Sequence, residues 1–219
     1  MNIYENFEHF DFKAIEKAFR DHPEKVHQSD IYGRTPIYHA IDQQRVDIID
    51  LLIDMKCNIN VQDRGGKTPL HWAFVCTPCN RDIIERLITA GSSGTILDER
   101  GRTPLHDAAV FAKDVNIINM LILISDPNIP DHLGYLPLHY CSGSSVNMDI
   151  LNSLIDVTHD IDSKDKWGRT NLYYSCHFKF YKIISVLLEN GANPFLDIDG
   201  YTPYQKADEQ GKQIIDSYL

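Results

Sequence analysis

The sequence predicts an all-α repeat solenoid in which each unit is a β-hairpin turn followed by two antiparallel helices. Three observations lead to this prediction. A short turn motif recurs along most of the chain, a helix-starting pair of residues follows most copies of it, and an apolar stretch with helical spacing comes later in each unit. Internal repetition with a period of about 20 to 50 residues indicates a repeat array, so we expect one elongated domain over residues 1–219.

The turn motif consists of Asp, two variable residues and Gly. Its glycines are spaced 33, 35, 33, 34 and 32 residues apart. They are Gly33, Gly66, Gly101, Gly134, Gly168 and Gly200. Gly adopts backbone angles that a side chain resists, and the Asp side chain can accept hydrogen bonds from amides of the turn. Each copy of the motif therefore predicts a hairpin tip.

A Thr-Pro pair after the turn predicts the start of the first helix of a unit. The Thr hydroxyl can cap free N–H groups, and Pro at the first helical position loses no hydrogen bond. The pair follows Gly33, Gly66, Gly101 and Gly200. In the two remaining copies Leu136 replaces Thr and Asn171 replaces Pro. We expect weaker capping and looser local structure in those two units.

The second helix of each unit is predicted by apolar residues at i, i+3 and i+4, as in residues 46–53, 82–88 and 181–188. Residues 12–19 show the same pattern without a preceding turn motif, which is typical of a degenerate first unit. Terminal repeats of a solenoid need polar outer faces, and residues 202–219 form a shortened polar unit. The predicted units are an N-terminal cap at 1–29, internal repeats at 30–62, 63–97, 98–130, 131–164 and 165–196, and a C-terminal cap at 197–219.

The chain resembles the ankyrin-repeat family, whose period is about 33 residues and whose signature is T-P-L-H-x-A. Residues 68–73 and 103–108 match the signature best, and the resemblance covers nearly the whole chain. It implies that buried histidines connect neighbouring hairpins and helices by hydrogen bonds, and that polar residues mark the ends of repeats. The histidines are His71, His106 and His139, and the repeat-end residues are Asn60, Asn128 and Asp162.

Composition limits the classes of partner. Lys and Arg number 21 against 31 Asp and Glu, so the formal net charge of −10 disfavours binding to nucleic acid. The longest apolar run, at 119–125, is shorter than the roughly 20 residues that cross a bilayer. The start of the sequence shows no secretory signal, and five scattered cysteines suit a reducing compartment. We expect a monomer in the cytoplasm or nucleus, without nucleic acid or membrane insertion.

The Ile-, Asn- and Asp-rich composition is compatible with an AT-rich genome. We therefore include a viral or bacterial host-interaction protein, acting in the host cytosol, among the expected functions.

Cys76-Thr-Pro-Cys79 raises a different hypothesis, because C-x-x-C is the motif of thiol oxidoreductases. In those proteins the motif opens a helix. Here Cys76 is expected at the end of a first helix, where the helix dipole disfavours a thiolate. The resemblance implies a non-enzymatic adaptor, scaffold or inhibitor that binds a protein segment in its concave groove. A thiol redox sensor or oxidoreductase using Cys76 and Cys79 is the alternative function.

The sequence contains no motif for a structural zinc site or a phosphate-binding loop. A structural zinc site needs four ligands, and the two cysteines have no second pair at suitable spacing. A phosphate loop ending at Gly66-Lys67-Thr68 would require Gly at position 61, which is Val61. We expect no enzymatic activity, no cofactor and no metal.

The candidate partner-binding residues lie on the concave groove that the family resemblance implies, which hairpin tips and first helices line. They include a largely basic row directly after the turn glycines and an aromatic group in the fourth and fifth turn-bearing units. Trp and Arg are enriched at interface hot spots, and Trp167 has no evident structural duty at a hairpin tip. The candidates are Tyr32, Arg34, Lys67, Arg102, Phe111, Leu133, Tyr135, Trp167, Arg169 and Phe178.

The residues of the groove suggest which partner it would suit. We expect another protein, through a segment with acidic and apolar character. Two extra residues in the interhelical loop at 76–81, and one each near 112–115 and 146–148, map to one face of the solenoid, and such faces often bind.

Overall fold

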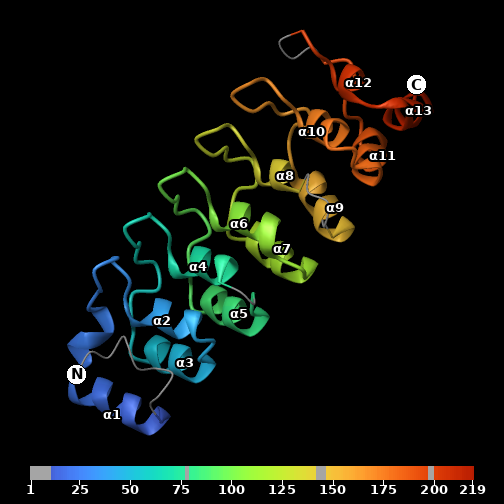
Figure 1. Ribbon diagram of the computed structural model, residues 1–219. Helices are drawn as coiled ribbons and strands as arrows, with labels where there is room; N and C mark the ends of the chain where they lie inside the picture. Colours follow the sequence, from blue (N-terminus) through green and yellow to red (C-terminus); the bar gives the residue numbers. More distant parts are fainter. Residues whose placement is uncertain (1–10, 77–78, 142–146, 197–199) are drawn as a thin grey trace.

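The computed structural model describes residues 11–76, 79–141, 147–196 and 200–219. Successive helix pairs stack along one direction, with α1 (Phe12–Asp21) and α13 (Glu209–Asp216) at opposite ends of the stack (Figure 1). Hairpin turns project from one side of the stack (Figure 1). The predicted solenoid is therefore confirmed.

The helices form two layers. The first helices of the units are α2 (Pro36–Asp42), α4 (Pro69–Val75), α6 (Pro104–Phe111), α8 (Pro137–Tyr140), α10 (Asn171–His177) and α12 (Pro203–Lys206). The second helices are α3 (Val46–Asp54), α5 (Arg81–Thr89), α7 (Val115–Ile122), α9 (Met148–Val157), α11 (Tyr181–Glu189) and α13 (Glu209–Asp216). At the N-terminal end, α1 (Phe12–Asp21) packs on α3 and is followed by the 3-10 helix η2 (Pro23–His27). α1 thus extends the layer of second helices, and its assignment to a degenerate first unit stays a prediction.

The core is continuous because five second helices, α3, α5, α7, α9 and α11, present the same buried triplet of Ile and Leu to their neighbours. All members are at most 4% exposed. The triplets are Ile48, Ile49 and Leu52; Ile83, Ile84 and Leu87; Ile117, Ile118 and Leu121; Ile150, Leu151 and Leu154; and Ile183, Ile184 and Leu187. Each unit thus buries its apolar face only when the next unit stacks on it.

The turn motifs form as the sequence predicts. At the first tip, the Asp30 carboxylate accepts hydrogen bonds from the backbone N–H groups of Tyr32 (2.8 Å) and Arg34 (2.9 Å). The same pair of bonds recurs at Asp63, Asp98, Asp131 and Asp165. The turn glycines have positive φ, for example 73° at Gly66. The start of the sixth motif, at 197–199, lies outside the described residues.

Backbone hydrogen bonds connect one tip to the next. Arg64 N–H donates to Tyr32 O (2.9 Å), and Glu99 N–H donates to Gly65 O (3.0 Å). At the next two tips, His132 N–H donates to Arg100 O and Lys166 N–H donates to Leu133 O. No extended strand forms among the described residues. The predicted β-hairpin turns are therefore tight turns joined into a ribbon.

The three histidines act as the family resemblance implies. His71 Nδ1 accepts from Thr68 N–H (3.2 Å), and His71 Nε2 lies 3.0 Å from Arg102 O in the next unit. His106 makes the same pair of contacts, to Thr103 N–H in its own unit and to Tyr135 O in the next one. His139 Nδ1 accepts from Leu136 N–H, but its Nε2 lies 3.1 Å from Ser163 O, at the end of its own unit just before the next turn. Because Nδ1 accepts, Nε2 carries the proton and donates. Burial lowers the pKa of all three imidazoles, which keeps them neutral.

The repeat-end residues also connect units. Asn60 Oδ1 accepts from Ser93 N–H (2.8 Å), and Asn128 Oδ1 accepts from His159 N–H (2.8 Å). Asp162 accepts from Asn193 N–H at 3.0 Å.

Tyr38 makes a connection that the sequence analysis missed. It occupies the place of the signature histidine in its unit, and its hydroxyl lies 2.6 Å from Val61 O and 2.7 Å from Lys67 O. Lys67 O corresponds to the carbonyl that His71 contacts one unit later. A buried tyrosine hydroxyl can therefore replace imidazole as the donor between units.

The two departures from Thr-Pro have different outcomes. Leu136 offers no side-chain acceptor, and α8 spans four residues. In the next unit the Thr170 hydroxyl oxygen accepts a hydrogen bond from Tyr173 N–H (3.2 Å) and caps α10. The prediction of weaker capping at this helix start is therefore wrong. Asn171 is buried, and its amide donates to Leu138 O (3.1 Å) in the preceding unit. The looser structure expected in these units stays a prediction.

Candidate functional site

Tyr135 is the centre of an aromatic cluster in the units that contain α8 and α10. Its ring centroid lies 5.6 Å from Tyr140, 5.9 Å from Tyr174 and 6.3 Å from Trp167. Its hydroxyl lies 2.8 Å from the Tyr174 hydroxyl. Tyr135 follows a turn glycine, whereas Tyr140 and Tyr174 come from first helices, so the cluster joins two successive units.

Trp167 lies at a hairpin tip and is 47% exposed. The Arg169 guanidinium lies 4.4 Å from its ring centroid and 4.9 Å from that of Tyr174. Asp165 holds this arrangement, because its Oδ2 accepts from Arg169 Nε (3.0 Å) and from the Tyr174 hydroxyl (2.6 Å). The indole is thus supported from one side while about half of it faces solvent.

Phe178 and Leu133 extend the exposed apolar area. Phe178 follows α10, is 53% exposed and stacks on Tyr174 with an interplanar angle of 8°. Leu133 lies at the preceding hairpin tip and is 43% exposed. We call the combined set the aromatic surface: Leu133, Tyr135, Trp167, Arg169, Tyr174 and Phe178.

A smaller group of similar design lies near the N-terminal end. The Arg34 guanidinium lies 3.9 Å from the ring centroid of Trp72 and 5.4 Å from that of Tyr32, which is 57% exposed. Trp72 Nε1 donates to Asp42 Oδ1 (2.6 Å). Trp72 was missed by the sequence analysis, although its contact with a post-glycine arginine parallels that of Trp167.

Lys67 and Arg102, two members of the basic row, are mostly buried in an ion-pair network. Their side chains are 16% and 14% exposed. Lys67 Nζ lies 2.6 Å from Asp107 Oδ2, and Arg102 lies 2.9 Å from Asp98 Oδ2 and 3.2 Å from Asp107 Oδ1. Asp107 is fully buried. The two cations and two carboxylates balance, so this placement favours a structural role between two units.

Asp98 shows how the network favours ionised side chains. Burial alone would raise the pKa of this carboxyl. The backbone N–H groups of Arg102 and Arg100 and the Arg102 guanidinium outweigh burial, and the pKa of Asp98 lies below its ordinary value.

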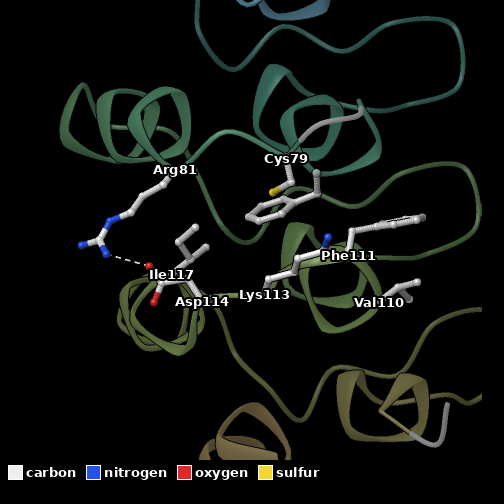
Figure 2. A pocket seen from close by; sticks show the side chains of 8 residues that line it. Cys79, Arg81, Val110, Phe111, Lys113, Asp114 and Ile117 are labelled. Atoms are coloured by element: carbon white, nitrogen blue, oxygen red, sulfur yellow. Dashed lines mark hydrogen bonds and ion pairs between the residues drawn. The ribbon is translucent and has the colours of Figure 1, made fainter. Parts of the chain in front are cut away.

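Phe111, the remaining candidate, lines a pocket of about 620 Å³ between the α4–α5 and α6–α7 connections. Figure 2 shows the lining side chains around the opening, with Cys79 and Phe111 from the two successive units. The lining residues are Phe74, Cys79, Arg81, Val110, Phe111, Lys113, Asp114 and Ile117.

Comparison with known proteins agrees with the architecture. A family model described as "Ankyrin repeats (3 copies)" matches residues 8–93, 75–165 and 138–217. The chain belongs to the ankyrin-repeat family.

Two relatives of this ankyrin-repeat chain cover it to different extents. Ankyrin repeat protein nuc-2 of Neurospora crassa is 28% identical over 169 residues, which are 76% of this chain and 16% of that protein. A putative ankyrin repeat protein of Rickettsia bellii is 41% identical over 59 residues, which are 26% of this chain and 33% of that protein. The chain therefore spans well under two thirds of the length of these relatives.

The thiols of this ankyrin-repeat chain do not have the environment of redox cysteines. Cys76 follows the C-terminal end of α4, as predicted, and its thiol donates to Asp42 Oδ1 (2.9 Å). Burial and this carboxylate raise the pKa of Cys76, and burial raises the pKa of Cys79 against the opposing charge of Lys113. Reactive thiols need the opposite shift. The alternative of a thiol redox function is therefore not supported.

Two kinds of feature do not occur in the described part of the chain. No group of three or more His, Cys, Asp or Glu side chains is arranged to hold a metal ion. Among the same residues, no helix has the length and apolar character needed to cross a bilayer.

Proposed function

We propose that this chain is a non-enzymatic adaptor, scaffold or inhibitor that holds a segment of a partner protein along its concave groove. Ankyrin arrays present extended concave surfaces that bind other proteins. The observation that carries the proposal is the aromatic surface, where Trp167 at a hairpin tip stays about half exposed although its neighbours hold it in place.

The aromatic surface has the features of an interaction hot spot. Trp, Tyr and Arg supply much of the binding energy at protein interfaces. Hydrogen bonds from Arg169 and Tyr174 to Asp165 fix both side chains before a partner arrives. Side chains that are already ordered lose less conformational entropy on binding. This surface is therefore better prepared for contact than a set of isolated exposed apolar residues.

The charges around the aromatic surface suit a segment with acidic and apolar character. Lys166 is exposed at the same hairpin tip as Trp167. Lys206 lies 4.3 Å from the ring centroid of Tyr201 in the following unit. A partner could place apolar side chains against Trp167 and Phe178 and carboxylates beside these cations. Lys67 and Arg102 contribute little exposed area, so the contact we propose centres on the aromatic surface.

The proposal extends to the setting in which the protein acts. We propose a monomer that works in the cytoplasm or nucleus, or in the host cytosol if the chain is a viral or bacterial host-interaction protein. The five free cysteines and the similarity to a Rickettsia protein support this setting.

Site-specific photocrosslinking tests the proposed function. A benzoylphenylalanine replaces Trp167 in one variant and Leu123, which is 84% exposed outside the groove, in the control. We expect a protein from the cell of origin to crosslink at position 167 and not at 123, and Trp167→Ala to weaken its capture. Equal crosslinking at both positions, or capture that Trp167→Ala leaves unchanged, would contradict the proposal.

A further inference from the structure

The pocket between the α4–α5 and α6–α7 connections has an apolar interior. Phe74 and Ile117 form its buried part, with exposed fractions of 0% and 2%. Val110 and Phe111, at the end of α6, are 47% and 40% exposed. An apolar side chain from outside could therefore bury its own surface together with the exposed parts of Val110 and Phe111.

Of the two cationic side chains that line the pocket, Arg81 is paired with carboxylates, whereas Lys113 has no carboxylate partner among the described residues. Arg81 pairs with Asp114 (2.6 Å), as the dashed line in Figure 2 shows, and also contacts Glu85. Asp114 in addition accepts from Asn116 N–H (2.9 Å) at the start of α7. Within the described part of the chain, no carboxylate lies within ion-pair distance of the exposed Lys113 ammonium.

Lys113 borders the pocket and is exposed to solvent. It lines the pocket together with Cys79, and its positive charge opposes the rise that burial causes in the pKa of the Cys79 thiol. In Figure 2 the Lys113 side chain extends across the opening between Phe111 and Cys79. An apolar hollow and an unpaired cation therefore lie side by side on a chain that is acidic overall.

The shape of the pocket favours a protein segment over a small molecule. Small-molecule sites enclose about 70–90% of their ligand. Here Val110, Phe111 and Arg81 all line the pocket and are exposed by 40% or more, so one face of any occupant stays open to solvent. A peptide backbone can continue along that open face while one side chain enters the pocket.

We propose that this pocket is a second docking site, which takes an apolar side chain of a partner protein segment and pairs a neighbouring carboxylate with Lys113. The proposal goes beyond the proposed function because the site is separate from the aromatic surface and binds or fails to bind independently of it.

A peptide array tests the occupant directly. Amidated peptides carry one Phe or Leu at the centre and Asp, Asn or Lys at a neighbouring position, and the labelled full chain is applied to them. We expect the wild type to prefer Asp peptides over Lys peptides by about tenfold, and Lys113→Glu to reverse that preference, because like charges at an interface repel. An unchanged ranking in Lys113→Glu, or no peptide bound, would overturn the proposal.

Three variants show whether peptide binding depends on the apolar contact at Phe111 or on another apolar surface of the protein. Phe111→Ser should reduce binding of all central Phe and Leu peptides, whereas Leu123→Ser, at an exposed apolar position elsewhere, should leave it unchanged. Thermal unfolding followed by circular dichroism confirms that each variant folds. If Trp167→Ala abolishes array binding and Lys113→Glu does not, the peptides bind the aromatic surface, which overturns this proposal and leaves the proposed function intact.

The array also distinguishes a protein segment from a small carboxylic acid. Free 4-phenylbutyrate provides the same apolar group and carboxylate without a peptide backbone. We expect it to compete at least about tenfold more weakly than the best Asp peptide, because a peptide also contacts the open face. Tighter binding of phenylbutyrate than of any peptide would overturn the assignment to a protein segment.

Discussion

Arg102 and Arg169 occupy the same position in their repeats, yet they contribute to different features of the molecule. Each follows a turn glycine and pairs with the aspartate of its own turn, at 2.9 Å for Arg102 and 3.0 Å for Arg169. Five residues later the first helix presents Asp107 in one unit and Tyr174 in the other. Asp107 draws Arg102 into a buried ion-pair network, whereas Tyr174 leaves Arg169 beside the exposed Trp167. For these two arginines, the residue five positions later separates a structural cation from one on the groove surface.

The largest effect is expected at Asp107. Asp107→Asn leaves Lys67 and Arg102 partly buried with Asp98 as their remaining carboxylate. Removing one partner of a buried network costs about 3 kcal/mol of unfolding free energy or more. Tyr174→Phe, which removes one hydroxyl from the corresponding position, should cost about 1 kcal/mol. Urea unfolding measures both, and equal costs would contradict the distinction between the two positions.

Substitutions of turn glycines test whether the hairpin tips near the buried ion-pair network and those near the aromatic surface have the same backbone geometry. A Cβ on Gly66 would lie 2.8 Å from Glu99 N, and a Cβ on Gly134 would lie 2.9 Å from Lys166 N. Gly191 also has positive φ, but nothing lies within 4 Å of its Cβ position. We expect Gly191→Ala to cost about 1–2 kcal/mol from its backbone angle alone. Gly66→Ala and Gly134→Ala should cost more than this and about the same as each other.

Urea unfolding measures the loss of unfolding free energy in each variant. Unequal losses in Gly66→Ala and Gly134→Ala would show that the two hairpin tips differ in backbone geometry as well as in side chains.

A decrease in pH should lower the unfolding free energy of the protein, because protonation of the buried histidines opposes folding. Because the folded-state pKa of His71, His106 and His139 is lowered, the unfolded chain binds more protons once the pH falls below about 6.5. The unfolding free energy should be constant above this pH in respect of these groups and should fall as the pH decreases toward 5. Denaturant titrations at half-unit intervals measure the slope. In His106→Asn the slope should be smaller, and an unchanged slope would contradict this assignment.

The smallest effect on stability is expected at Trp167. Trp167→Ala removes a half-exposed side chain and one contact with Arg169, so the unfolding free energy should change by less than about 1 kcal/mol. Binding of a partner captured through position 167 should nevertheless fall by about tenfold or more. Urea unfolding and a binding titration measure the two effects. A large loss of stability would indicate that Trp167 is structural, like Lys67 and Arg102.

The local features of the fold could be predicted because they depend on residues close together in the sequence. The turn Asp and Gly, the Thr-Pro helix starts and the apolar spacing of the second helices lie within one unit. The contacts of His71 and His106 reach the next unit, and that of His139 reaches the end of its own unit, but the family signature implies such contacts. Tyr38 was missed because a hydroxyl takes the place of an imidazole there, and the signature gives no sign of that exchange.

The features that were not predicted depend on which side chains meet across units. The burial of Lys67 follows from Asp107, which is 40 residues later in the sequence. The pocket forms only where Cys79 and Phe111 approach each other from successive connections. A comparison of each post-glycine residue with the residue five positions later would have separated Arg102 from Arg169. The same comparison would have drawn attention to Trp72.

Acrylamide quenching of Trp167 tests the central claim most directly. The chain contains two tryptophans, so Trp72→Phe leaves Trp167 as the only source of tryptophan fluorescence. In the free protein we expect strong quenching, because the indole is 47% exposed. Adding a saturating amount of the partner segment crosslinked at position 167 should lower the quenching constant at least about twofold, as burial in an interface excludes the quencher. A quenching constant that stays the same at saturation would contradict the claim that the aromatic surface holds the partner.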